Sequence, residues 1–219
     1  VARQLTTDEY NRTIKDLTGI SINVNKEVGI KKEHNAHAFS NNAADMQMSP
    51  LLIEKYFDAA DLIISKLTDS KESEKAKKYL FEGIETETNT DAMKFINRFL
   101  IKAYRRKVSA NEVRRLFPLY SLMRAKGKSF QDALIYSLKP VLVSPYFLNK
   151  VEANRAPRNS KKVYLASNME LAVRLSYFIW STMPDDELLN IAAQNKLRNA
   201  DEIITQVNRM LKDEKSNAM

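Results

Sequence analysis

Hydrophobic residues recur at helical spacing along most of this chain. In the segment LTTDEYNRTIKDLTG, Tyr10, Ile14 and Leu17 share one face of a helix, and Gly19 is a typical C-terminal stop. Comparable stripes predict helices over residues 49–67, 73–81, 91–106, 109–126, 130–144, 169–180, 184–194 and 200–212. Alternation of strand type is confined to residues 162–165. The pattern predicts an all-α protein, an irregular bundle of about eight or nine helices with at most a two-stranded ribbon.

Polar residues mark where several helices begin. Thr6 with Glu9, and Ser109 with Glu112, have the spacing of a capping box, and Thr90 is the expected cap of the helix over 91–106. Two prolines fall inside helical stripes. Pro118 and Pro140 each remove a backbone donor, so we expect the helix to bend or break at both positions.

Two stretches interrupt the helical pattern. Ile20 to Met48 has no sustained period, and we predict a long ordered loop with Phe39 buried. Loops of this length inside a domain are uncommon and often functional. Residues 149–162 are polar and net basic, which is typical of a linker. The expected organisation is a first helical module over 1–67 that includes the long loop, a second over 68–150, and a third, truncated, over 163–219.

Charge is distributed unevenly. The 219 residues carry a net charge of +8, and Asp91 to Lys128 alone holds eleven Lys or Arg against two acidic residues. The second module is therefore basic and the remainder nearly neutral. The chain has no cysteine, which excludes disulfides, thiolate metal sites and covalent C-x-x-C-H haem attachment within these residues. No apolar run approaches the ~18 residues that a membrane span requires.

Three separated motifs carry a family resemblance. The first is LTTDEYNRTIKDLTG followed by AFSNNAADMQMSPLLIEKYFDAA, the second is AYRRKVSANEVRRLFPLY with LVSPYFLNKVE, and the third is LAVRLSYFIWSTMPDDELL. In this order they resemble three successive modules of the planctomycete-type secreted proteins associated with cytochrome c. Pro118 and Pro140 depart from the family pattern.

The resemblance carries expectations about setting. It implies an exported protein, periplasmic or secreted, in an electron-transfer or oxidative context. Haem c would be bound by flanking domains, because no attachment site lies in this stretch, and those domains or a separate protein are the expected partners. Val1 begins the chain with neither an initiator Met nor a signal-peptide pattern, so we expect an internal stretch of a longer chain.

Few residues suggest chemistry. His34 and His37 are the only histidines, and His37 is a weak candidate for a haem ligand; with no third ligand evident, we predict no metal site. Asn41 and Asn42 match the family motif and are candidate contacts to a partner or substrate, although hydrogen bonding to nearby backbone that shapes the loop is the favoured role of their amides. In the basic module, Arg105 and Arg106 are candidate partner contacts.

The stretch Leu171 to Leu189 is the densest in aromatic residues. It predicts a buried helix with Leu171, Leu175, Phe178 and Ile179 on its core stripe, followed by a sharp turn at Pro184. Asp185 and Asp186 would then begin the next helix and complement its dipole, rather than form a catalytic pair.

These features leave more than one function open. The leading hypothesis is a cofactor-free helical scaffold or interaction region of a larger exported protein, with no catalytic residue in this stretch. The alternative is a basic helical module that binds nucleic acid or an acidic polysaccharide, with nucleic acid the less favoured of the two. A third hypothesis places an active site in the long loop and requires His37 and Asn41 to converge.

Overall fold

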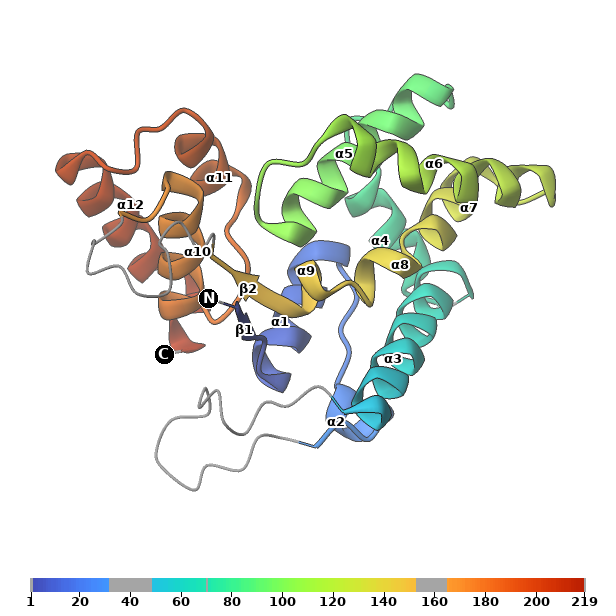
Figure 1. Ribbon diagram of the computed structural model, residues 1–219, viewed down its shortest axis with the longest axis horizontal. Helices are drawn as coiled ribbons and strands as arrows, with labels where there is room; N and C mark the ends of the chain where they lie inside the picture. Colours follow the sequence, from blue (N-terminus) through green and yellow to red (C-terminus); the bar gives the residue numbers. More distant parts are fainter. Residues whose placement is uncertain (1, 32–48, 70, 153–164, 219) are drawn as a thin grey trace, which may run out of the picture.

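The computed structural model describes residues 2–31, 49–69, 71–152 and 165–218, and confirms the predicted all-α class (Figure 1). Nine helices of eight or more residues lie in this part of the chain: α1 (Thr7–Thr18), α3 (Pro50–Asp69), α4 (Ser73–Leu80), α5 (Asn89–Tyr104), α6 (Ala110–Ala125), α7 (Phe130–Ser137), α10 (Asn168–Ile179), α11 (Asp186–Ala193) and α12 (Ala200–Lys212). The shorter helices are α2 (Val24–Glu27), α8 (Lys139–Leu142), α9 (Pro145–Leu148) and the 3-10 helix η1 (Glu214–Ala218).

Capping boxes start several helices. The Thr6–Glu9 and Ser109–Glu112 boxes are both present, as predicted. The prediction of Thr90 as the cap of α5 was wrong, because the Thr88 hydroxyl accepts a hydrogen bond from the Asp91 amide at 3.1 Å and α5 begins at Asn89.

The two prolines behave differently. Of the bend or break predicted at Pro118, the break does not occur, and α6 runs through this residue. Pro118 and Arg114, whose carbonyl loses its helical partner, are both exposed, so water can satisfy that carbonyl. At Pro140 the interruption is confirmed, since α7 ends at Ser137 and the short helix α8 follows.

The two irregular stretches are partly described. The beginning of the long loop contains α2 and buries Ile20, Val24 and Ile30, whereas residues 32–48, including Phe39, lie outside the described residues. The expected linker begins with a strand: β2 (Asn149–Val151) pairs antiparallel with β1 (Ala2–Gln4), with Arg3 opposite Lys150. This ribbon lies elsewhere than the strand-like residues 162–165, of which only Leu165 is described.

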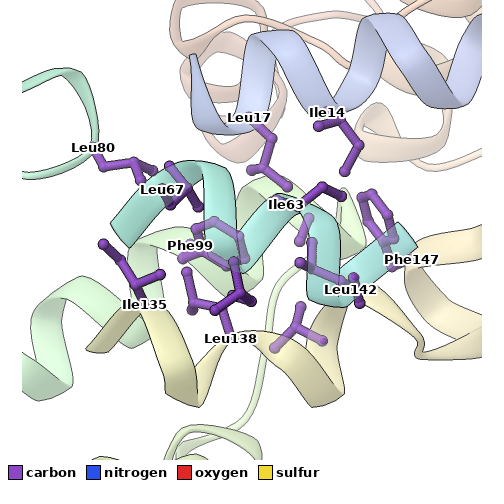
Figure 2. Packing of buried hydrophobic residues seen from close by; sticks show 14 of the residues in the cluster. Ile14, Leu17, Ile63, Leu67, Leu80, Phe99, Ile135, Leu138, Leu142 and Phe147 are labelled. Carbon is purple, nitrogen blue, oxygen red and sulfur yellow. The ribbon is translucent and has the colours of Figure 1, made fainter. Parts of the chain in front are cut away.

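One hydrophobic core unites the helices from α1 to α9. Figure 2 shows α3 at its centre, with Ile63 and Leu67 between Leu17 of α1 on one side and Leu138 and Leu142 on the other. Residues of the first two predicted modules therefore share a single core.

Helices α10 to α12 form a second, smaller core around Trp180, Leu188 and Met210. They lie together at one side of the molecule, coloured orange to red in Figure 1. The predicted stripe on α10 is only partly correct: Ile179 and Trp180 are buried, but Phe178 is 74% exposed. Helix α10 instead turns Tyr177 toward the larger core and Ile179 toward the smaller one. Phe178, which lies between them in the sequence, faces solvent. No helix of the described chain has the length and hydropathy to cross a membrane.

Candidate functional site

A cleft of about 1400 Å³ opens where the two parts of the fold meet. Its walls come from the β1–β2 ribbon, the first turns of α1, the connection between α5 and α6, and one side of α10. Apart from β1 and α1, which follow one another directly, these segments are distant in the sequence, so the shape of the cleft depends on the contacts that hold them together.

Arg105 makes the central contact. It follows the last residue of α5 in a left-handed conformation, with φ of 53°, which turns its side chain back into the molecule. The guanidinium donates to the carbonyls of Tyr146, Phe147 and Asn149 at 3.1, 2.7 and 2.8 Å, and to the Tyr177 hydroxyl at 3.1 Å. Arg105 is 3% exposed, so this buried cation ties α5, α9, β2 and α10 together.

Tyr177 extends the same network to α1. Its hydroxyl shares a hydrogen bond with Thr13 at 2.9 Å, and burial raises the pKa of this phenol. The Lys150 ammonium lies 4.9 Å from the Tyr177 ring centre and pairs with Glu9 at 2.6 Å. Helix α10 is therefore attached to the ribbon and to α1 by polar groups shielded from water.

Arg106, the next residue, lies at the edge of the cleft. Its guanidinium stacks on the rings of Tyr104 and Tyr146, at 5.2 and 4.6 Å, and pairs with Glu112 at 2.6 Å. Hydrogen bonding from Arg106 lowers the pKa of Glu112 to about 2. This side chain is partly exposed and fixed in orientation.

The remaining charges of the cleft are unequal in sign. Glu9 pairs with Lys150, and Glu152 pairs with Arg174 at 2.7 Å. Three cations of the wall, Arg3, Arg12 and Lys107, are exposed and form no ion pair with any described residue; these are named the rim cations below.

Apolar side chains cover another part of the wall. Phe178 and Val151 are 74% and 47% exposed, and Met169, Leu171 and Leu175 line the same cleft. The cleft therefore combines positive charge at its rim with an apolar surface on α10.

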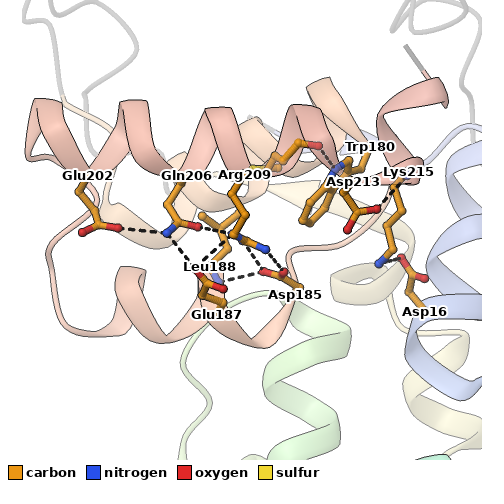
Figure 3. Close-up of polar contacts among 11 residues, drawn as sticks. Asp16, Trp180, Asp185, Glu187, Leu188, Glu202, Gln206, Arg209, Asp213 and Lys215 are labelled. Carbon is orange, nitrogen blue, oxygen red and sulfur yellow. Dashed lines mark hydrogen bonds and ion pairs between the residues drawn. The ribbon is translucent and has the colours of Figure 1, made fainter.

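A second polar cluster holds the C-terminal helices (Figure 3). Arg209 makes two hydrogen bonds to Asp185, at 2.6 and 3.1 Å, and its Nε donates to Gln206 at 2.9 Å. Asp185 also caps α11 by accepting from the Leu188 amide at 2.9 Å. Trp180 donates from its indole to the Met210 carbonyl at 2.9 Å, which attaches α12 to the end of α10.

Two ion pairs connect this C-terminal part to the rest of the molecule. Lys215 pairs with Asp16 of α1 at 3.1 Å, and Lys102 of α5 pairs with Asp186 at 2.8 Å. As predicted, Asp185 and Asp186 begin a helix after the turn at Pro184. Each carboxylate has a cationic partner, and the two together act in helix capping and packing.

The sequence candidates are placed as follows. Both Arg105 and Arg106 line the cleft. Arg105 is buried and its two terminal nitrogens donate to groups of the fold, whereas Arg106 is partly exposed. His37, Asn41 and Asn42, together with His34, lie outside the described residues. Within the described part, no group of three or more His, Asp or Glu side chains could hold a metal ion.

Most cations of the basic module serve the fold. Arg98 donates to the carbonyls of Leu80 and Glu82, both at 2.6 Å, and so closes the end of α4 onto α5. Lys102, Arg105 and Arg106 are engaged as described above, so these four cations of the basic module are used in internal contacts.

Sequence reasoning missed Tyr177, Lys150 and Arg209 as polar contacts between segments. No local pattern pairs Tyr177 with Thr13, which is 164 residues away. A tyrosine within the apolar stripe of a helix was the one sequence feature that indicated such a contact, because a buried tyrosine hydroxyl usually forms a hydrogen bond.

The fold and the cleft define a helical protein built from several segments that polar contacts join. Comparison with family models agrees with this organisation: residues 3–69 match PSD3, a protein of unknown function (DUF1587), residues 91–152 match PSD5, a protein of unknown function (DUF1595), and residues 166–219 match PSD4, a protein of unknown function (DUF1592). The chain thus contains three consecutive modules of unknown function. No curated protein and no solved structure matches it.

Proposed function

We propose that this chain is a helical scaffold and interaction region of a larger exported protein associated with cytochrome c. In this proposal it binds no cofactor itself, haem c belongs to flanking domains, and the setting is electron transfer or oxidation in the periplasm or outside the cell. The resemblance of the three motifs to the cytochrome-associated family supports the setting.

The scaffold role rests mainly on one observation, the buried Arg105. A guanidinium that joins four segments through one tyrosine hydroxyl and three carbonyls fixes the relative positions of α1, the ribbon and α10. Burying a cation is costly unless it is hydrogen-bonded, and here both terminal nitrogens of the guanidinium donate to groups of the fold. Displacing any of these segments would break such bonds, which favours a rigid junction. A rigid junction with an open cleft suits a region that positions neighbours and binds a partner.

The basic alternative is less well supported. Polyanion binding requires several free cations on one face. In α5 and the connection after it, Arg98, Lys102 and Arg106 each have a partner, and Arg105 is buried. Retention on immobilised heparin at low salt that falls by orders of magnitude at moderate salt, through roughly six contacts, would favour the alternative.

Unfolding tests the scaffold role directly. Trp180 is the only tryptophan and lies in the C-terminal part, so its fluorescence follows α10 to α12, whereas far-UV circular dichroism follows all helices. For a rigid scaffold the two urea transitions coincide. Two separated transitions in the unmodified chain would overturn this role.

The setting needs a separate test on the natural full-length protein. Haem staining of that protein after denaturing electrophoresis, combined with cell fractionation, should show covalently bound haem in the exported fraction. A full-length protein without haem, or one retained in the cytoplasm, would contradict the setting and leave the scaffold role untouched.

A further inference from the structure

We propose that the cleft binds an acidic peptide segment that carries apolar anchor residues. The proposal rests on the interaction role proposed above and names the class of partner. It joins three observations about the same cleft: its size, the sign of its unpaired charges, and its exposed apolar wall.

The size favours a segment of polypeptide over a small molecule. Pockets for small ligands usually have volumes of ~300–1,000 Å³. The cleft has about 1400 Å³ and is bounded by four separate segments of the chain. An extended stretch of several residues, at ~3.3 Å each, would contact all four walls at once.

The charges favour an acidic partner. Four carboxylates line the cleft. Glu9 and Glu152 are already paired, Glu170 accepts a hydrogen bond from the Ser167 amide at 2.6 Å, and Asp8 is likewise not without a partner. The rim cations Arg3, Arg12 and Lys107 have no ion pair among the described residues. Carboxylates of a partner would supply this missing charge and give complementary potentials across the interface.

The apolar wall distinguishes a peptide from other anions. Phe178 is 74% exposed, although the residues before and after it in α10 are buried. Val151, Leu171 and Leu175 line the same cleft. Apolar side chains of this kind suit Leu or Phe anchors, because burying such surfaces together is worth ~25 cal/mol per Å². A polysaccharide or a nucleic acid would find three free cations and one exposed aromatic ring, whereas those ligands depend on repeated phosphate contacts or stacking platforms.

Selection from a random peptide library tests the proposal on the intact chain. The chain would be immobilised and panned against displayed peptides of roughly ten residues, long enough to cross the cleft. We expect the enriched peptides to combine Asp or Glu with Phe or Leu. Labelled copies would then be measured by fluorescence anisotropy at moderate salt, where exposed charge–charge contacts are partly screened.

Matched variants locate the binding site. The double variant Arg12→Glu, Lys107→Glu should raise Kd at least ~10-fold, about 1.4 kcal/mol, and Phe178→Ser should raise it several-fold. Arg115→Glu and Leu211→Ser change an exposed cation and an exposed apolar residue away from the cleft, and both should leave Kd within about twofold.

Several results would overturn the proposal. These are no enrichment, enrichment of peptides without acidic residues, equal binding of heparin at the same salt, or affinities that the cleft variants leave unchanged. Coincident unfolding transitions together with any of these results would leave the scaffold role standing, so the two failures can be distinguished.

Discussion

The guanidinium of Arg105 donates a hydrogen bond of 3.1 Å to the hydroxyl of Tyr177, which lies 72 residues further along the chain. This contact joins the end of α5 to the last turn of α10, and the same guanidinium donates to carbonyls of α9 and β2. Arg105 therefore helps to fix the position of α10, and with it one wall of the cleft, together with the contacts of Tyr177 to Thr13 and Lys150.

Arg105→Met should therefore destabilise the protein strongly. Methionine fills part of the volume, but it leaves three carbonyls without this donor, each costing ~1–3 kcal/mol where water cannot replace it. The Tyr177 hydroxyl keeps only its hydrogen bond with Thr13. We expect a total loss of about 3–5 kcal/mol, measured from urea transitions by circular dichroism. Lys107→Met, two residues away and exposed, is the control and should change stability by less than about 0.5 kcal/mol. Equal effects of the two changes would refute the central role of Arg105.

Asp185→Asn tests whether the acidic pair is structural. Asparagine keeps the cap on the Leu188 amide but loses the charge that faces Arg209 at 2.6 Å. The dipole contribution alone predicts ~0.3–1 kcal/mol, and the two hydrogen bonds to the half-buried Arg209 raise the expected loss to about 1–2 kcal/mol. Thermal unfolding followed by Trp180 fluorescence would measure it. In the full-length protein, loss of an activity at unchanged stability would show instead that Asp185 belongs to a functional site.

The local features of the fold were predictable because their causes are local. Each of the helix caps Thr6 and Ser109 pairs with a glutamate three residues later, so both partners can be recognised in a short stretch of sequence. The helical stripes likewise depend on spacings of three and four residues. Fold class and most helix positions follow from such patterns.

Contacts between segments could not be predicted in this way. Arg105 with Tyr177 and Lys215 with Asp16 join positions that no local spacing relates. Phe178 was misplaced for a related reason: α10 serves two cores, with Tyr177 toward one and Ile179 toward the other, and a single apolar stripe does not reveal which side remains open. The cleft arises from these long-range contacts, so it too was outside the reach of pattern analysis.

Stability should fall in acid through Glu112. Hydrogen bonding from Arg106 lowers the pKa of Glu112 from 4.5 to about 2. A lowered pKa in the folded state contributes stability above the unfolded value, and that contribution is lost as the pH falls from about 4.5 toward 2. We expect about 1–2 kcal/mol from this group, after allowance for its partial exposure.

The Arg106→Met variant isolates that contribution. It removes the main cause of the shift, so its stability should depend less on pH between 4.5 and 2 than that of the unmodified chain. Asp91, whose pKa is also lowered to about 2 by hydrogen bonds from Thr86 and Thr88, is unchanged in both proteins and cancels in the comparison. Urea midpoints measured across this pH range provide the test, and parallel curves for the two proteins would contradict the assignment.

Pro118→Ala should stabilise the protein. Helix α6 continues through Pro118 although the ring removes the hydrogen bond to the Arg114 carbonyl, and both residues are exposed. Alanine restores that hydrogen bond and has a higher helix propensity, which together stabilise the folded state by up to ~3 kcal/mol. It also makes the unfolded chain more flexible, which lowers the free energy of unfolding by ~0.4–1 kcal/mol. The net expectation is a gain of about 1–2 kcal/mol, seen as a higher melting temperature. Pro145→Ala is the matched control, because Pro145 is the first residue of α9, where proline loses no helical hydrogen bond, and it should bring no gain. A lower melting temperature for Pro118→Ala would contradict this prediction. It would show that the packing of α6 on α7 requires a bend that the proline imposes, and that the missing hydrogen bond at the Arg114 carbonyl belongs to that bend.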